Sequence, residues 1–505
     1  MGTKLRIARN ILANWGGLAL STLVSFLLAP FILRKLGDAG YGVWMLAISL
    51  TGYLGLLDLG IRASVVRYVS KHKAASDYQS LNRVINTSLI AYSGAGLIAL
   101  ILGVILGLSA GSVFNIPENL EHAATWVIIL ISASMAFGFG IGVFASTLAG
   151  IERFDLLNLS MSVGNLLRAA LVLIVLPLAP SLVALALVSF CSSLVTFLMI
   201  AYFASRYEPN LRINLRLADR ETARSIFNYG IYSFLIIIAT RVAYYSDNTV
   251  IGIFGSAEQI TYFAIGAISV EFLRRIVNSL TTVILPVASS LENRGSEESL
   301  TRLLITGTRY SFLLILPLSA ILLVMGKTLL GVWMGPIYAE KSYLILVIML
   351  IPQIYCFSQF STEEILLGTG RHRLFALIAV AEAVANLVLS IILIRPYGII
   401  GVALGTLIPA IIFRVLLSPL FIRQITQSSF TSYLKKSLLP PFIICVPVVI
   451  LALILNRWLT AESLFEIGLQ GFLLLLVYYL LAWMYVIEKP IKDSILKRFK
   501  ILAAQ

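Results

Sequence analysis

The run ILANWGGLALSTLVSFLLAPFIL occupies residues 11–33 and follows the basic residues Lys4, Arg6 and Arg9. A helix of about 20 apolar residues crosses the roughly 30 Å of hydrocarbon in a bilayer, so this run is long enough to span a membrane. Basic residues before an apolar run also occur in secretory signals, but this run is longer than a signal core and no cleavage pattern follows it. The sequence therefore predicts a retained first transmembrane helix.

Apolar runs of similar length recur along the whole chain. Of its 505 residues, 59% are hydrophobic and only 12% are charged, and the mean hydropathy is +0.95. These values are typical of a polytopic membrane protein and not of a soluble domain. We expect an all-α fold with about fourteen transmembrane helices. The predicted spans are residues 10–33, 40–66, 82–110, 122–149, 157–178, 181–203, 225–250, 257–288, 302–326, 342–366, 373–394, 398–421, 437–455 and 466–487.

The distribution of basic residues predicts the orientation. The formal net charge is +14, but lysine and arginine are scattered through loops and do not gather on one soluble face, so we expect no contact with nucleic acid. Basic loops remain in the cytoplasm. With both termini cytoplasmic, as in a protein of the bacterial inner membrane, the external connections hold few basic residues, namely Arg34, Lys35, Lys327, Lys341, Arg395 and Arg457.

Cysteine and histidine give no sign of a cofactor or a metal site. Cys191, Cys356 and Cys445 lie in separate apolar runs, without a CxxC motif or ligand spacing to a histidine. We find no motif that would support hydrolysis or nucleotide consumption. We therefore expect a protein that is not an enzyme and holds no cofactor, and the sequence leaves coupling to H⁺ or Na⁺ open.

Residue identities recur at a constant offset of 218 residues, as in Asn10 and Asn228, Gly150 and Gly368, and Arg153 and Arg371. The repeat holds an even number of predicted helices, so both copies run in the same direction and should be related by an axis along the membrane normal. The predicted organisation is a six-helix lobe at 1–203, a cytoplasmic linker at 204–224, a second, pseudo-symmetric six-helix lobe at 225–423, and two further helices with a basic tail at 424–505.

The linker has a pattern of its own. Apolar and polar residues alternate from Leu211 to Leu217, which predicts an extended segment, and Asp219 is placed to cap the helix that follows.

Ionisable residues inside the predicted helices need an explanation, because each costs about 2.5–3.5 kcal/mol at mid-bilayer unless it faces a cavity or a partner. In the second predicted helix a polar stripe at spacing i, i+4, i+7, i+11 consists of Thr51, Gly55, Asp58 and Arg62. In the eighth, its repeat partner, the same spacing joins Glu271, Arg275, Asn278 and Thr282, with Arg274 alongside. We expect the two stripes to face each other.

The seventh predicted helix adds Arg241, Tyr245 and Asn248 on one face, with Asp247 near its external end. These stripes predict a cationic cavity between the lobes. The candidate substrate-binding residues are Arg62, Arg241, Arg274, Arg275, Asn278 and Tyr245. The candidate residues for ion coupling are Asp58, Asp247, Glu271 and Glu382.

Structural roles for the same residues remain open. Asp58 with Arg62 and Glu271 with Arg275 can be ion pairs that only stabilise packing, and Arg274 and Arg275 can extend to lipid phosphates at the interface. Tyr245 can be an interfacial anchor.

Three further residues inside the predicted helices have the same alternatives. For Arg168 and Arg414, packing or extension toward the interface is the favoured interpretation. Glu382, beside Asn386 at i+4, is either a proton-titrating carboxyl or a packed hydrogen-bonding group.

Several short motifs carry a family resemblance. They are LAPFILRKLGDAGYGVW at 28–44, LLDLG at 56–60, YSDNTVIG at 245–252, WMG at 333–335, LGTGR at 367–371 and YGIIGVA at 397–403. With these motifs the chain resembles bacterial polysaccharide-unit flippases of the Wzx type, in the superfamily that also holds multidrug and toxin extruders and the lipid II flippase.

The resemblance implies two six-helix lobes around a central cationic cavity. It also implies the substrate, an undecaprenyl pyrophosphate-linked oligosaccharide that is made on the cytoplasmic face and turned outward for assembly of O-antigen, capsule or exopolysaccharide. The implied partners are this lipid-linked oligosaccharide, membrane lipids and the polysaccharide polymerase machinery, and we expect a monomer. The two helices after the twelfth resemble those that hold the prenyl tail in the lipid II flippase.

Two other functions compete with a flippase. A cation-coupled multidrug extruder usually lines its pocket with acidic and aromatic residues, whereas the charge excess inside these helices is basic. A membrane polysaccharide polymerase or glycosyltransferase generally has a long external loop with catalytic residues, and the predicted external loops here are short. A scaffold would not need polar stripes in matched helices. The sequence does not identify the sugar.

Overall fold

The computed structural model describes residues 3–227, 231–281, 283–490 and 492–493. Within these residues every regular element is a helix, which confirms the predicted all-α fold. Contacts group the chain into two compact units, unit 1 with residues 1–264 and 390–402, and unit 2 with residues 265–389 and 403–505. The predicted lobe boundaries follow from the repeat and not from contacts, and they stay a prediction.

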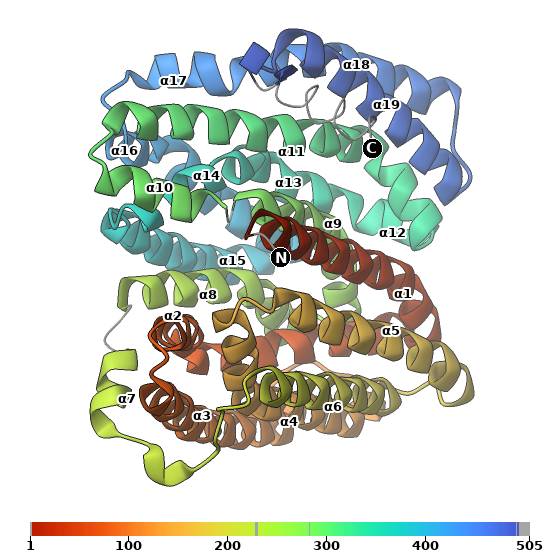
Figure 1. Cartoon of the computed structure of the whole chain (residues 1–505). Helices are drawn as coiled ribbons and strands as arrows, with labels where there is room; N and C mark the ends of the chain where they lie inside the picture. Colours follow the sequence, from red (N-terminus) through yellow and green to blue (C-terminus); the bar gives the residue numbers. More distant parts are fainter. Residues whose placement is uncertain (1–2, 228–230, 282, 491, 494–505) are drawn as a thin grey trace, which may run out of the picture. The chain divides into compact units, whose positions relative to one another are not determined.

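Unit 1 is a bundle of long helices with short connections (Figure 1). Its elements are α1 (Thr3–Leu54), η1 (Gly55–Asp58), α2 (Ile61–Ala74), α3 (Tyr78–Val113), α4 (Glu118–Gly150), α5 (Phe154–Leu178), α6 (Leu182–Tyr207), η2 (Leu215–Leu217), α7 (Arg220–Phe227) and α8 (Ile231–Phe254). Helix α4 packs against α3 and α6, and α1 packs against α4, α5 and α8. A core that includes Val65, Ile85 and Val143 joins α2, α3 and α4.

Unit 2 is arranged around one long helix, α11 (Glu297–Trp333), which packs against α13, α18 and α19. The other elements are α10 (Ile284–Asn293), α12 (Pro336–Lys341), α13 (Tyr343–Ser358), α14 (Phe360–Gly368), η3 (Ala410–Leu416), α16 (Ser418–Arg423), α17 (Phe430–Ser437), α18 (Leu439–Trp458) and α19 (Leu464–Tyr485). Helices α9 (Ala257–Thr281) and α15 (Arg373–Pro409) contribute residues to both units.

Two of the helices are sharply bent, and each contains one predicted span and the first part of the next. Helix α1 bends at Gly37 (φ 70°) and α15 at Gly398 (φ 58°). Positive φ is accessible to glycine without steric cost, so the chain can reverse at these positions. The reversal at Gly398 is tight, because a Cβ added to Gly401 would lie 2.0 Å from the carbonyl oxygen of Leu393.

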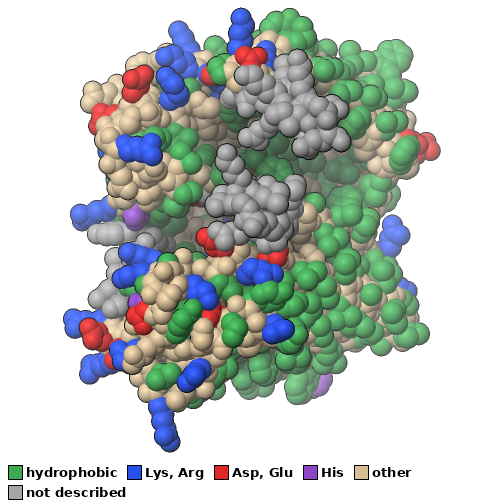
Figure 2. All heavy atoms as spheres, viewed as in Figure 1, with side chains coloured by type: hydrophobic (Ala, Val, Ile, Leu, Met, Phe, Trp, Pro, Cys, Tyr) green, Lys and Arg blue, Asp and Glu red, His purple; other side chains and the backbone are tan. Residues whose placement is uncertain are grey.

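The described residues contain nine helices that are long and apolar enough to cross a membrane, and the bent pair α13 and α14 makes a tenth. Every predicted span overlaps a helix, and the two sharply bent helices account for four of the predicted spans. Figure 2 shows hydrophobic side chains covering the flank of unit 1 that α4, α5 and α6 form, with lysine and arginine gathered toward the end that holds α2 and α7. This surface fits helices in contact with lipid and basic loops in contact with water.

The linker after α6 is held against α3 by side chains of α3 that form hydrogen bonds with the linker backbone. Asn82 donates to the carbonyl of Asn210 (2.9 Å) and accepts from the backbone amide of Arg212 (2.7 Å). Asn86, one turn later, donates to the carbonyl of Arg212 (2.8 Å) and accepts from the amide of Asn214 (2.8 Å). The predicted extended segment is therefore confirmed for residues 211–214, and residues 215–217 form η2.

Asp219 caps α7, as predicted. Its carboxylate accepts from the backbone amides of Thr222 (2.9 Å) and Glu221 (3.2 Å). These hydrogen bonds, first among them the one from the Thr222 amide, lower the pKa of Asp219.

Candidate functional site

The second predicted span is not one continuous helix. After α1 ends at Leu54, Gly55–Asp58 form a 3₁₀ turn, and Leu59 (φ 50°) and Gly60 (φ 74°) adopt left-handed conformations before α2 begins at Ile61. The turn changes the direction of the chain, so the spacing that placed Asp58 and Arg62 on one helical stripe does not apply. The prediction of a continuous stripe was wrong because the sequence gives no sign of this break. A leucine beside Gly60 fits the apolar pattern of a helix, whether its backbone is helical or left-handed.

Asp58 and Arg62 nevertheless lie together, with a third partner from α3. The Tyr92 hydroxyl donates to Asp58 Oδ1, and Arg62 Nε lies 3.9 Å from Asp58 Oδ2. The Arg62 side chain is 59% exposed, so a pair at this distance leaves most of the guanidinium open to other anions. Tyr92 is fully buried and fixes the carboxylate.

Arg241 and Tyr245 of α8 pack directly on α1. Arg241 Nη1 donates to the Tyr245 hydroxyl (3.1 Å), and the Tyr245 ring lies against the ring of Tyr53 with centroids 5.7 Å apart. The ring occupies the space over Gly52, where an added Cβ would lie 2.2 Å from Tyr245 Cζ. An added Cβ on Gly55 would lie 3.5 Å from Arg241 Cζ, so the guanidinium sits over the 3₁₀ turn that bears Asp58.

The charge of Arg241 is not neutralised by a carboxylate. Within the described ranges its hydrogen bond goes to the neutral hydroxyl of Tyr245, and no ion pair joins it to an aspartate or glutamate. Arg168 on α5 is comparable, since its Nε is buried and has no hydrogen-bond partner in the described part of the chain. Extension of Arg168 to the lipid interface is not what the structure shows.

Two further predicted residues of α8, Asn248 and Asp247, are packed inside unit 1. Asn248 donates to the Ser49 hydroxyl (3.0 Å) of α1, and Asp247 is 4% exposed. Tyr245 is half-buried, whereas its neighbour Tyr244 is 42% exposed. The position of Tyr245 between α1 and α8 is that of a packed residue and not of an interfacial anchor.

The stripe on α9 in unit 2 is dominated by one carboxylate. Glu271 accepts from Arg274 Nε (2.7 Å) and from Arg275 Nε (3.1 Å), so the packing ion pair considered for Glu271 and Arg275 is present. Asn278 is exposed, and Thr282 lies outside the described residues. The two stripes lie in different units, and their facing each other stays a prediction.

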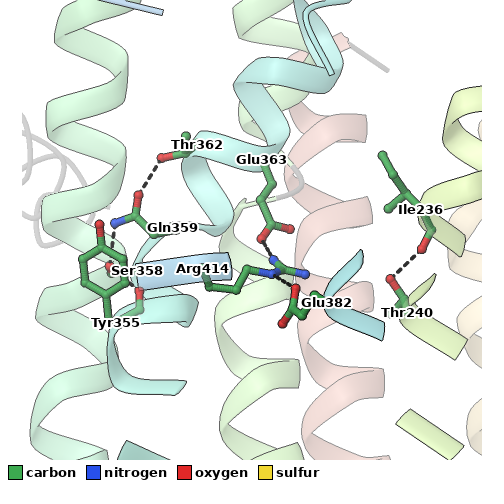
Figure 3. A network of polar contacts seen from close by, with 9 residues as sticks. All are labelled: Ile236, Thr240, Tyr355, Ser358, Gln359, Thr362, Glu363, Glu382 and Arg414. Carbon is green, nitrogen blue, oxygen red and sulfur yellow. Dashed lines mark hydrogen bonds and ion pairs between the residues drawn. The ribbon is translucent and has the colours of Figure 1, made fainter. Parts of the chain in front are cut away.

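A partly buried ion triad in unit 2 joins residues that are far apart in the sequence (Figure 3). Arg414 bonds Glu363 of α14 through Nη1 and donates through Nε to Glu382 of α15 (2.5 Å). Arg414 belongs to a π-helical segment, and such segments are frequent at functional sites. We call Glu363, Glu382 and Arg414 the Arg414 triad.

The Arg414 triad resolves one open interpretation, because Arg414 is packed and paired rather than extended to the interface. Glu382 is hydrogen-bonded to Arg414, and its role as a proton-titrating carboxyl stays a prediction. Asn386 donates instead to the Thr406 hydroxyl (2.8 Å).

Sequence reasoning missed Glu363 and Tyr92. Glu363 falls near the end of the predicted span 342–366, where a charge can reach water, so nothing marked it as buried. In the described part of the chain, no group of three or more His, Cys, Asp or Glu side chains could hold a metal ion.

Long apolar helices with ionisable side chains held inside them define a polytopic membrane protein of the transporter type. The chain belongs to the family of polysaccharide biosynthesis proteins, because residues 7–292, more than half of its length, match that family. The family resemblance drawn from the sequence motifs is thereby confirmed.

Several relatives align with most of the chain. A protein of Shigella flexneri that is named as an O-antigen transporter is 24% identical, over 83% of this chain and 99% of its own length. EpsK, a membrane protein of Bacillus subtilis, is 22% identical over 98% of each chain. Agl15 of Haloferax volcanii, named as a flippase of low-salt glycan biosynthesis, is 24% identical over 76% of each chain.

Solved structures share the fold. The lipid II flippase MurJ in an inward closed conformation is similar with a TM-score of 0.71 and 16% identity, covering 94% of this chain and 97% of that chain. A multidrug resistance transporter of the MATE family in an inward-facing conformation gives a TM-score of 0.68 and 16% identity, covering 85% of this chain and all of that chain. At these identities the likeness establishes the fold alone.

Proposed function

We propose that the protein is a flippase that moves a lipid-linked oligosaccharide across the membrane for polysaccharide assembly. Family membership supports this proposal, as do relatives from S. flexneri and H. volcanii that are named as transporter and flippase and align along most of both chains. The helices that carry the Arg414 triad are long and apolar enough to span a membrane, and the sequence predicts the same for residues 225–250, which include Arg241.

The observation that carries the proposal is the guanidinium of Arg241, which has no carboxylate partner among the described residues. A cation inside the membrane is costly when it lacks a counter-charge, and an anionic substrate would supply one. A pyrophosphate diester carries negative charge on both phosphates, and a guanidinium donates paired hydrogen bonds to phosphate oxygens. Arg241 is therefore the first candidate for the headgroup site, and Arg62 the second.

The predicted residues on α9 are ranked lower on the same argument. Arg274 and Arg275 already bond Glu271, so an incoming anion would have to compete with that carboxylate. Tyr245 positions Arg241, and Asn278 is exposed and able to contact a sugar. The basic excess inside the predicted membrane helices also disfavours a pocket for cationic drugs.

The finer features of transport follow the same proposal. The carrier is undecaprenyl pyrophosphate, whose prenyl chain can remain in lipid while the headgroup passes through a polar cavity. Transport runs from the cytoplasmic to the external leaflet of the bacterial inner membrane, by alternating access of the two halves. The termini are cytoplasmic, and the protein acts as a monomer that delivers substrate to polysaccharide polymerase machinery.

The Arg414 triad is the candidate site for ion coupling. Two carboxylates share one guanidinium there, so the triad has one negative charge in excess, which a proton or Na⁺ can neutralise. Glu271 accepts from two arginines, and Asp58 pairs with Arg62, so neither site has a comparable excess of negative charge. Glu382 is thus the preferred coupling residue of the four predicted, with Glu363 added by the structure.

Complementation of a deletion strain tests the headgroup site. Arg241→Ala should abolish export of the sugar unit and cause lipid-linked oligosaccharide to accumulate on the cytoplasmic side, while Arg241→Lys should restore export in part. Arg302→Gln is the matched control, because Arg302 is exposed and its ion pair among the described residues is with the exposed Glu298. Normal export by a stably inserted Arg241→Ala protein would remove Arg241 from the substrate site.

A second pair of variants separates binding from packing at Arg62. If Arg62 only pairs with Asp58, the double variant Asp58→Asn/Arg62→Gln should recover the export that either single variant loses, since no orphan charge remains. If Arg62 holds the headgroup, the double variant should stay inactive.

A further inference from the structure

The linker between α6 and α7 exposes large apolar side chains although its backbone is held in place. Ile213 is 59% exposed and Leu215 is 56% exposed. The hydrogen bonds with Asn82 and Asn86 hold the backbone on both sides of Ile213. Glu208, at the start of the linker, is buried and ion-paired. The exposure of Ile213 and Leu215 therefore belongs to an ordered segment, which indicates contact with a partner other than water.

The linker is amphipathic. Side chains alternate between the two faces of an extended segment, so Leu211 and Ile213 lie on one face and Arg212 lies on the other. Leu211 packs against the core of unit 1, and Ile213 continues this apolar face beyond the core. Arg212 and Arg216 are both exposed. Apolar side chains beside exposed arginines are the pattern of a segment that lies in a membrane interface.

The positive charge of the linker continues into α7, where Arg220 and Arg224 lie one turn apart and are exposed. Residues 211–224 contain four arginines and two acidic residues, and one of the acidic residues, Asp219, caps α7. The segment is therefore positively charged, as a partner of anionic lipid headgroups should be. We call the following side chains the linker surface: Ile213, Leu215, Arg212, Arg216, Arg220 and Arg224.

Helices α3 and α6 set the depth of the linker surface. Helix α3 has 36 residues. It is about 54 Å long at 1.5 Å per residue, whereas the hydrocarbon of a bilayer is about 30 Å thick. With the excess shared between its ends, about eight residues at each end extend beyond the hydrocarbon, which places Asn82 and Asn86 at the boundary. Helix α6 exposes Tyr202 and Tyr207 near its end, and tyrosine is enriched at the membrane–water interface. The linker thus leaves the bundle in the headgroup layer.

We propose that the linker surface binds the anionic lipids of the cytoplasmic leaflet. Ile213 and Leu215 enter the edge of the hydrocarbon, and the four arginines contact lipid phosphates. Lipid is favoured over a cytoplasmic protein as the partner because of the depth of the linker and its continuity with the exposed apolar side chains of α6, such as Leu198. This lipid contact is separate from the transported substrate.

Fluorescence quenching in nanodiscs tests the depth of the linker surface. In full-length protein without its native cysteines, Ile213→Cys carries a fluorophore, and the nanodiscs contain phosphatidylcholine that is brominated on its acyl chains. Brominated lipid should quench this label, and acrylamide in the water should not. A label on Ala75→Cys, in the exposed turn between α2 and α3, should show the opposite pattern. Quenching of the label at position 213 by acrylamide and not by brominated lipid would overturn the proposal.

Brominated phosphatidylglycerol then tests the charge preference. At equal mole fraction it should quench the label at position 213 at least about twofold more than brominated phosphatidylcholine does, because each arginine near an anionic surface strengthens binding by about fivefold. Arg212→Gln/Arg216→Gln should lower this ratio toward one, and Arg212→Lys/Arg216→Lys should retain it. The backbone bonds of Arg212 to α3 remain in these variants. Arg302→Gln, a control in unit 2, should leave the ratio unchanged.

Two results would refute the preference for anionic lipid. One is equal quenching by the two brominated lipids, and the other is an unchanged ratio in Arg212→Gln/Arg216→Gln. A label that acrylamide reaches in nanodiscs but not in inverted native membrane vesicles would show that a cytoplasmic protein covers the linker surface, and the lipid proposal would fail. None of these measurements depends on transport, so a failure of the proposed flippase function would be seen separately.

Discussion

Replacing Arg414 by methionine is expected to destabilise the protein by about 3 kcal/mol, the lower end of the range for buried ion pairs, because it leaves partly buried carboxylates without their counter-charge. The side chains of Arg414, Glu363 and Glu382 are only 23%, 22% and 16% exposed, so solvent screens them weakly. Both guanidinium contacts are lost together, since Arg414 bonds Glu363 through Nη1 and Glu382 through Nε.

The triple variant Glu363→Gln/Glu382→Gln/Arg414→Met should recover most of this loss. The triple variant has no charge in the triad, so no unpaired carboxylate or guanidinium has to be desolvated. Replacements of this kind often change the free energy of unfolding very little. The difference between the triple variant and the sum of the single variants gives the coupling energy directly.

Equilibrium unfolding of purified protein in mixed micelles, with increasing sodium dodecyl sulfate, measures these free energies. Arg302→Gln serves as the control and should change stability by no more than about 0.5 kcal/mol, because that arginine is 81% exposed. An Arg414→Met protein as stable as the wild type, or a triple variant no more stable than Arg414→Met, would refute the reasoning.

Two other predictions follow from close packing and from orientation. Gly52→Ala should reduce sugar export, because the new Cβ would lie 2.2 Å from Tyr245 Cζ and must displace that ring. The control Gly94→Ala has open space at its Cβ and should leave export unchanged. Equal export by the two variants would count against a role for the Tyr245 contact. In a variant without native cysteines, Glu118→Cys should react with an impermeant external thiol reagent and Ser428→Cys should be protected, and the opposite labelling would reverse the orientation.

The helical architecture could be predicted because the hydropathy of each segment is a local signal. An apolar run such as residues 11–33 must be helical in lipid so that its backbone amides and carbonyls form hydrogen bonds, whatever its neighbours are. The linker was also predictable, since alternation in Leu211–Leu217 and a cap at Asp219 are short-range signals. Their partners Asn82 and Asn86 were not, because a hydrogen bond across more than a hundred residues leaves no mark in a local pattern.

The polar residues were identified more reliably than their arrangement. Asp58, Arg62, Arg241 and Tyr245 were selected because charge and hydrogen-bonding groups are rare in membrane helices, and the structure places them in two neighbouring contacts of unit 1. Their supposed helical stripe failed at Leu59, whose left-handed conformation interrupts the helix. Periodicity predicts a shared face only while the helix continues.

The ion triad shows the other limit of sequence reasoning. Arg414 and Glu382 were noticed singly, but the pairing of Arg414 with Glu363 joins α14 to a π-helical segment, and only the fold brings them together. A π-helix shifts the register of the side chains that follow, so spacing rules for an α-helix do not find such a partner.

The most direct test of the flippase account is translocation by purified protein in liposomes. A labelled lipid-linked oligosaccharide is placed in both leaflets, and an impermeant enzyme that cleaves the sugar is added outside. Liposomes with wild-type protein should lose the label from both leaflets, while empty liposomes and those with Arg241→Ala should lose only the outer-leaflet fraction. Loss of the outer-leaflet fraction alone with folded wild-type protein, under every proton or sodium gradient applied, would contradict the account.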